Sequence, residues 1–187
     1  MRADAQKNYQ RLLSVAREVF QESGAEASLR DIARKAGVGL GTLYRHFPTR
    51  EALLEALLRD GFEALAAQAD ALLQAESADA ALVAWLQQII AFTHSQRGVI
   101  APMMHAIEDE ASALHGSCVR LRASGAALLM RAQRQGSARP DLDGDALFDL
   151  IAALAWLREQ PSHAARADRI FALVTGAVLN QEAARGD

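Results

Sequence analysis

The sequence predicts an all-α protein, and three observations support this prediction. Alanine, the residue with the highest helix propensity, accounts for 40 of the 187 residues, and leucine is also abundant. Apolar residues recur at spacings of three and four along much of the chain, and no strong run alternates apolar and polar residues as a half-buried strand does. The four prolines, at positions 48, 102, 140 and 161, can each stand at a junction between helices.

The composition also excludes several classes of protein. Apolar residues make up 51% of the chain, which is too many for a disordered protein. The polar N-terminus lacks a signal peptide and no stretch approaches 18 uncharged apolar residues, so we expect a cytoplasmic protein without a membrane span. A single cysteine excludes an intrachain disulfide. Residues 1–60 carry ten Lys and Arg against eight Asp and Glu, whereas residues 61–187 carry ten against fifteen, so a mildly basic segment precedes an acidic one.

Three helices are predicted within the first 50 residues. The first covers 9–23, with one apolar face formed by Leu12, Leu13, Ala16, Val19 and Phe20. The second begins at Ser28, which forms a capping-box-like pair with Asp31, and ends at Gly37. The third begins at Gly39, whose glycine can supply the turn conformation, and Pro48 ends it.

A larger set of helices follows this N-terminal group. Thr49 can cap a long fourth helix, and further helical patterns cover about 79–95, 99–114, 117–135, 142–158 and 163–182, giving about nine helices in all. Three short helices with a glycine turn between the second and third form a helix-turn-helix frame. We therefore expect a DNA-binding module in residues 1–60 and a helical body in residues 61–187.

The third helix has one face suited to packing and one suited to DNA. Leu43 and Phe47 are four residues apart, so both face the core. Around the opposite side lie Gly41, Thr42, Tyr44 and Arg45. Hydroxyl groups bond phosphates, an arginine can fork onto guanine O6 and N7, and a bare glycine lets the backbone approach DNA closely. This face therefore predicts binding in the major groove.

Residues 28–54 read SLRDIARKAGVGLGTLYRHFPTREALL, and residues 9–60 resemble the DNA-binding segment of TetR-type transcriptional regulators. Residues 109–156 resemble the body of a subgroup that includes SbtR-like regulators. The resemblance implies a homodimeric repressor that binds a palindromic double-stranded DNA operator and is released by a small-molecule effector. It implies contacts to DNA from Arg30, Leu40, Thr42, Tyr44, Arg45 and His46, and a phosphate contact from Arg50.

Three positions depart from the usual pattern of that family. Leu40 stands where other members place a polar base reader, so it can offer only apolar contact, for example to a thymine methyl group. Gly39 replaces a frequent serine that would cap the helix. Arg50 replaces a usual lysine at the head of the fourth helix.

The body is expected to hold an effector and to form the dimer. A pocket between helices spanning about 79–130 needs bulky apolar walls and a few polar groups, and its candidate lining is Trp85, Phe92, Met103, Met104, His105 and Glu108. The simplest assignment for most large apolar residues, Trp156 included, is the core, and a close-packed body without a ligand is the alternative. The two most apolar helices, near 145–159 and 167–180, predict a two-fold four-helix interface through Leu147, Leu150, Ile151, Leu154, Ile170, Phe171, Val174 and Val178. The alternative is that both helices fold back into their own core.

The sequence also suggests two chemical alternatives and one structural alternative. His94, His105 and His115 with Glu108, Asp109 and Cys118 suggest a metal, but no closed ligand set is present, and we predict neither metal nor cofactor. Cys118, His115 and Glu108 suggest a nucleophile, its base and an orienting group. No strand–elbow–helix context supports them, and we predict no catalytic residue. A helical interaction module that binds no DNA is the third alternative.

Overall fold

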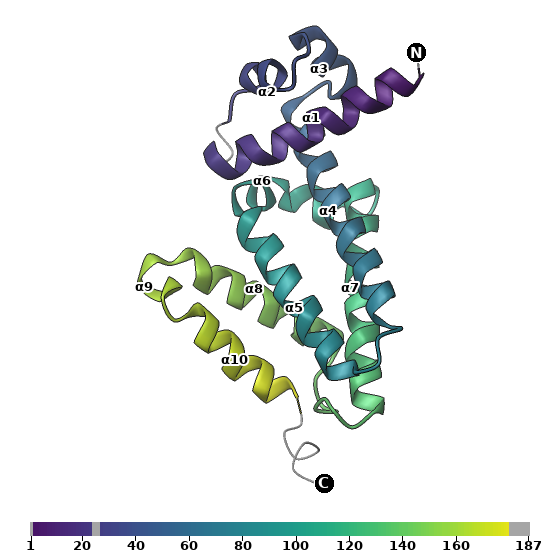
Figure 1. Cartoon of the computed structure of the whole chain (residues 1–187), viewed down its shortest axis with the longest axis vertical. Helices are drawn as coiled ribbons and strands as arrows, with labels where there is room; N and C mark the ends of the chain where they lie inside the picture. Colours follow the sequence, from purple (N-terminus) through teal and green to yellow (C-terminus); the bar gives the residue numbers. More distant parts are fainter. Residues whose placement is uncertain (1, 24–26, 180–187) are drawn as a thin grey trace. The chain divides into compact units, whose positions relative to one another are not determined.

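The computed structural model of the chain describes residues 2–23 and 27–179. Within this part of the chain ten α-helices follow one another, nine of them seven residues or longer, and no strand is present (Figure 1). The all-α prediction is therefore confirmed. The C-terminal region differs in detail, because the helix expected over 163–182 is divided into α9 (Pro161–Ala164) and α10 (Ala167–Val178). Residues 180–182 of that expected helix lie outside the described residues.

The helices cluster into two compact units. The first unit contains the described residues up to Gly61 together with Ser95–Gly116. The second unit contains Phe62–His94 and the described residues from Ser117 onward. Three helices have residues in both units: α4 (Arg50–Leu72), α5 (Ala78–Ser95), of which only Ser95 belongs to the first unit, and α7 (Ala113–Arg134). The sequence predicted a DNA-binding module in residues 1–60 and a body in residues 61–187. This division refers to function, and it stays a prediction.

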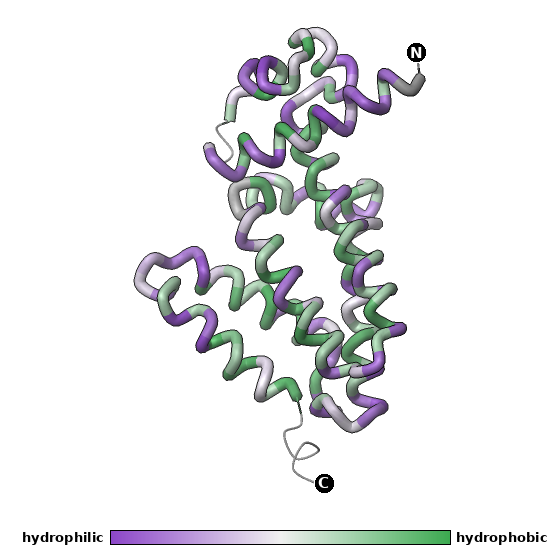
Figure 2. Tube along the Cα trace, in the orientation of Figure 1, coloured by the Kyte–Doolittle hydropathy of each residue, from purple (hydrophilic) through white to green (hydrophobic). Residues whose placement is uncertain are grey.

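The first unit is built from short helices around one apolar core. Its elements are α1 (Arg2–Ser23), α2 (Leu29–Lys35), α3 (Leu40–His46), the start of α4 and α6 (Arg97–Glu108). The predicted apolar face of α1 is confirmed, because its five residues are at most 4% exposed: Leu12, Leu13, Ala16, Val19 and Phe20. Figure 2 shows hydrophobic and hydrophilic residues alternating along α1, as expected for a helix with one buried face.

The ends of α2 and the start of α4 follow the predicted capping. Ser28 Oγ accepts a hydrogen bond from Asp31 N at 3.4 Å, and Thr49 Oγ1 accepts one from Ala52 N at 3.1 Å. At the other end of α2, Gly37 has a φ of 65°, and its N–H donates to Arg34 O. Val38 N donates to Ala33 O at 3.0 Å, which completes a Schellman motif. The chain therefore turns from α2 into α3 at Gly37, in a backbone conformation that would be strained in a residue with a side chain.

The second unit packs around Trp85. Its elements are the rest of α4, most of α5 (Ala78–Ser95) and of α7, α8 (Gly144–Glu159), α9 and α10. The Trp85 side chain is fully buried, its Nε1 donates to Leu65 O at 3.0 Å, and its ring meets Phe148 edge-on. Gly125 of α7 lies against the same ring, and a Cβ built on it would lie 2.3 Å from Trp85 Cη2. Four helices thus meet at one indole.

A methyl group at position 125 should destabilise this unit. We expect Gly125→Ala to lower the free energy of unfolding by about 1–3 kcal/mol, because the new methyl group would overlap a buried indole that is held by a hydrogen bond. Gly116→Ala in the same helix is the matched control, since a Cβ there meets nothing within 4 Å. We expect it to leave stability unchanged or raise it by up to about 1 kcal/mol. Equal urea denaturation midpoints for the two variants would contradict the packing described here.

Candidate nucleic-acid interface

The third helix of the helix-turn-helix frame is fixed from one side. Thr42 N and Leu43 N both donate to Gly39 O, at 2.9 and 3.2 Å, and no side chain caps the helix. Leu43 is fully buried and Phe47 is 2% exposed, so the predicted inner face is confirmed. Gly39 has φ −68° and ψ 148°, an extended conformation that any residue adopts. The expectation that Gly39 supplies a special turn conformation was therefore wrong, and Gly37 supplies it instead.

The opposite face of α3 is open. Tyr44 is 46% exposed, and Arg45 and Gly41 are also exposed. A Cβ built on Gly41 would meet nothing within 4 Å, so the backbone at this point is bare. Leu40 and Thr42 are half-buried at the edges of the face. The face offers a phenol, a guanidinium and an uncovered stretch of backbone.

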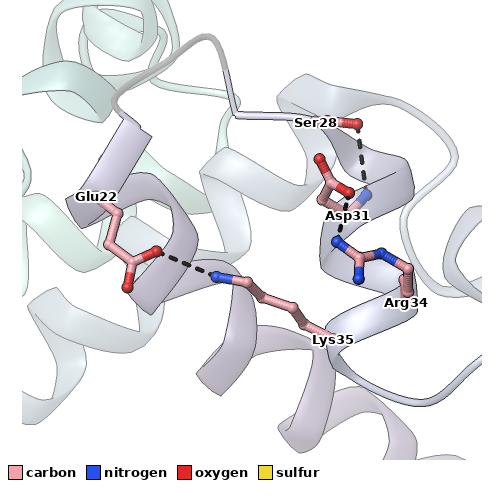
Figure 3. A network of polar contacts seen from close by, with 5 residues as sticks. All are labelled: Glu22, Ser28, Asp31, Arg34 and Lys35. Carbon is pink, nitrogen blue, oxygen red and sulfur yellow. Dashed lines mark hydrogen bonds and ion pairs between the residues drawn. The ribbon is translucent and has the colours of Figure 1, made fainter.

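The charged side chains of α2 divide into paired and unpaired cations. Lys35 Nζ lies 3.1 Å from Glu22 Oε2 of α1, and Arg34 Nη2 lies 3.0 Å from Asp31 Oδ1. Figure 3 shows both contacts. Because both pairs are largely exposed, each contributes at most about 1 kcal/mol to stability. Arg30, in the first turn of α2, is exposed and has no ion-pair partner among the described residues. Arg30 and the equally unpaired Arg45 are thus the cations of α2 and α3 that are available to an anionic partner.

His46 lies beside an aromatic residue that the sequence did not single out. Its ring meets Tyr9 of α1 edge-on, with centroids 6.1 Å apart, and Tyr9 also lies 5.1 Å from the Phe47 ring. These rings line a groove of about 220 Å³ together with Glu55 and Arg59 of α4. His46 is half-buried, so one side of it remains reachable. Tyr9 was missed because it precedes the apolar face of α1 and stands among polar residues.

Arg50 points inward in this structure. Its Nη1 donates to Ala27 O at 2.8 Å, and its guanidinium lies 5.4 Å from the centre of the Phe20 ring. Its Nη2 is buried and has no hydrogen-bond partner among the residues that the structure describes. The sequence predicted a side chain presented to a phosphate, and this conformation instead connects the head of α4 to Ala27, two residues before the start of α2.

The six residues expected to line an effector pocket do not come together around one cavity. Trp85 is part of the close-packed core, and Phe92 packs edge-on against Phe62 in the same unit. The other four belong to α6 in the first unit, where Met103 is buried and three are exposed: Met104, His105 and Glu108. Spacing alone could not separate core residues from cavity walls, because both are apolar.

A groove of about 630 Å³ lies elsewhere in the second unit, between α5, α8 and α10. Its walls include Val83, Phe171 and Ala172, and Gln87, Arg158 and Thr175 supply polar groups. Arg158 Nη2 donates to Asp168 at 2.7 Å, and the Asp168 side chain is 94% exposed. The sequence missed this groove because α8 and α10 were assigned entirely to the dimer.

The predicted dimer residues occupy two faces of their helices. Five of the eight are at most 8% exposed within this subunit: Leu147, Ile151, Leu154, Phe171 and Val178. Leu150, Ile170 and Val174 are half-buried. Trp156 is 56% exposed and Leu173 is 65% exposed, so the assignment of Trp156 to the core was wrong. The five buried residues already fill their own subunit, because each helix is apolar on more than one side.

The alternative chemical sites find little support in the geometry. Burial raises the pKa of the Cys118 thiol, and the charge of Arg122 opposes this only in part, so the reactive thiolate is disfavoured. His115 Nδ1 lies 2.8 Å from Ile107 O, which engages that ring nitrogen with the backbone. Among the described residues, no three His, Cys, Asp or Glu side chains gather as a metal ion would require. None of the described helices has the length and apolar character needed to cross a bilayer.

Two stretches of the sequence match known protein families. Residues 12–57 match the family described as bacterial regulatory proteins, tetR family. Residues 77–176, more than half of the chain, match the C-terminal domain of SbtR-like transcriptional regulators. The first match contains α2, α3 and the start of α4, and the second begins just before α5.

Solved structures and curated proteins that resemble this chain are also transcriptional regulators. A TetR transcriptional regulator from Streptomyces coelicolor is 33% identical, with a TM-score of 0.74, over 92% of this chain and 99% of its own. The TetR regulatory protein from Mycobacterium vanbaalenii is 30% identical over 96% and 99%, also with a TM-score of 0.74. An HTH-type transcriptional regulator from Staphylococcus aureus strain USA300 is 46% identical over 54 residues, and this match spans only 29% of that protein's length.

Proposed function

Because the chain belongs to the TetR family of DNA-binding transcriptional regulators, we propose that it is a repressor that binds a palindromic operator as a homodimer and is released by a small molecule. Regulators of this family bind DNA, typically as dimers and with small-molecule effectors, and they are not enzymes. We place its action in the cytoplasm, where its DNA target lies.

The exposed face of α3 is the observation that carries this proposal. Arg45 is exposed and unpaired among the described residues, so its fork of N–H donors is free for guanine O6 and N7. Tyr44 and Thr42 can donate to phosphate oxygens on either side, which fixes the register of the helix in the groove. Gly41 adds nothing that would hold the backbone away from DNA. Arg30 of α2 supplies a second exposed cation in the same helix-turn-helix frame.

A palindromic operator requires a two-fold dimer, for which α8 and α10 are the candidates. The exposed apolar side chains of Trp156 and Leu173 support an interface there, and Leu150, Ile170 and Val174 of the same two helices are half-buried. Two recognition helices about 34–36 Å apart would then enter successive major grooves on one face of the duplex. The half-sites of the operator should accordingly be one helical turn apart.

The groove between α5, α8 and α10 is the site that we propose for the effector. Apolar walls and a few polar groups are the usual lining of a small-molecule site, and a volume of about 630 Å³ is in the usual range. The Arg158–Asp168 pair joins a half-buried arginine to an exposed aspartate, and such a pair near the surface is weak enough for a ligand to replace. A ligand that prefers one arrangement of the dimer lowers DNA affinity by its difference in affinity for the two arrangements.

Filling the groove should block release without affecting operator binding. Ala91 of α5 is exposed and lines the groove. We therefore expect Ala91→Trp to abolish two effects of the ligand, the rise in melting temperature and the dissociation of the protein from DNA. Ala80→Trp, at an exposed position of the same helix outside the groove, is the control. The compound is found by thermal-shift screening of metabolites against the wild type. A ligand that still releases Ala91→Trp from DNA would place the effector site elsewhere.

Repression is tested with a reporter gene placed behind the operator. Expression of the protein should lower transcription of the reporter, and the released state should restore it. Arg45→Ala, which we expect to bind the operator more weakly and so to repress the reporter less, serves as the control. A reporter that is raised by the wild-type protein would identify an activator and overturn the assignment of repression.

A further inference from the structure

We propose that Arg50 is a positioning residue that fixes the first turn of α2, and through it Arg30, from inside the first unit without touching a DNA phosphate. The inference rests on the proposed DNA binding through α2 and α3. It assigns a role different from the phosphate contact that the position of Arg50 in the sequence suggests.

The contacts of Arg50 are all internal. Nη1 donates to Ala27 O at 2.8 Å, and the flat guanidinium lies 5.4 Å from the centre of the Phe20 ring. Both partners belong to the core, since Phe20 is 4% exposed and Ala27 is 2% exposed. Nη2 is buried, so a phosphate oxygen cannot reach it while the side chain holds this conformation.

The acceptor of this hydrogen bond has a special place in the chain. The first intrahelical acceptor of α2 is Ser28 O, which binds Ile32 N at 3.0 Å. The Ala27 carbonyl therefore precedes the helix, and a buried carbonyl of this kind needs a partner from another element. Arg50 supplies that partner, and Arg30 stands only three residues further along the chain. Loss of the Arg50–Ala27 hydrogen bond therefore allows the backbone at Ala27 to move, and the first turn of α2 follows directly from it.

An arginine suits this task better than a lysine. Its guanidinium is planar, so it can lie over an aromatic ring while an in-plane N–H donates to a carbonyl. A lysine ammonium has the same charge but no plane, and it is more strongly hydrated. Arg50→Lys thus separates geometry from charge, because a phosphate contact tolerates this substitution and the internal contact does not.

The salt dependence of operator binding distinguishes the two roles. We expect Arg50→Lys and Arg50→Met to weaken binding by a similar factor at every salt concentration between 50 and 200 mM, with an unchanged slope of log K against log salt. Each phosphate contact that is lost makes the slope shallower by about 0.9. A shallower slope in Arg50→Met together with full recovery in Arg50→Lys would overturn the proposal.

A double-mutant cycle tests whether Arg50 acts through Arg30. We expect Arg30→Ala to weaken operator binding by about 5- to 150-fold if it reads a base. In the Arg30→Ala background, Arg50→Met should have a much smaller effect than in the wild type, because the residue that it positions is gone. Fully additive losses would contradict action through Arg30.

Hydrogen exchange provides a readout that does not depend on DNA. In the free protein, Arg50→Met and Arg50→Lys should speed amide exchange in α2, beginning with the Ile32 amide, while the amides of α10 stay protected as in the wild type. Unchanged exchange in α2 would overturn the positioning role even if the wild type binds its operator. If the wild type binds no operator but amide exchange in α2 is faster in the variants, then Arg50 does hold the first turn of α2. In that case the proposed DNA-binding function is what fails.

Discussion

Leu173→Asp is expected to give a folded monomer that binds its operator about 10²–10⁴-fold more weakly than the wild type. Leu173 is 65% exposed in the subunit, so an aspartate there leaves the subunit's own core intact. At a two-fold interface the same change places two unpaired carboxylates in an apolar contact. A monomer engages only one half-site and loses the gain that comes from linking two binding modules. Sedimentation at micromolar concentration and operator titration measure both effects.

Val119→Asp and Met130→Asp are the matched controls for this experiment. Each replaces a large apolar side chain that is 50% exposed, but on α7 rather than α10. We expect both variants to remain dimeric and to bind the operator. A Leu173→Asp protein that sediments as the wild-type dimer would contradict the proposed interface, and so would a wild type that sediments as a monomer.

Arg45→Ala is expected to weaken binding by about 1–3 kcal/mol per half-site, and by about twice that for a symmetric operator. The physical reason is the loss of a bidentate contact to guanine, so discrimination at that base pair should fall as well. Affinities for the operator and for its single-base variants measure both quantities. Arg134→Ala, another exposed arginine in the last turn of α7, is the control and should bind like the wild type. An unchanged base preference in Arg45→Ala would show that Arg45 does not read sequence.

The sequence was sufficient where local rules determine the structure. Ser28, Gly37 and Thr49 act as the predicted start and stop residues, because capping depends on neighbours only a few positions away. Leu43 and Phe47 face inward as predicted, because a helix of seven residues has a fixed periodicity. The outward position of Tyr44 and Arg45 follows from the same rule.

Contacts between distant residues could not be derived in this way. Gly125 makes room for Trp85, which lies forty positions earlier, and no local pattern connects the two. Arg50 resembles a surface cation in sequence, but Phe20 and Ala27 draw it inward. The apolar faces of α8 and α10 could be counted from the sequence, but which face is free depends on how the helices pack.

Selection of bound DNA from random oligonucleotides tests the central claim most directly, namely that the open face of α3 reads a specific operator. The account predicts enrichment of an inverted repeat whose half-site centres lie about 10–10.5 base pairs apart. It also predicts that Arg45→Ala, carried through the same selection, loses the preference at one position in each half-site. The claim would be contradicted if the pool selected by the wild type remained random. It would also be contradicted if Arg45→Ala selected the same motif as the wild type.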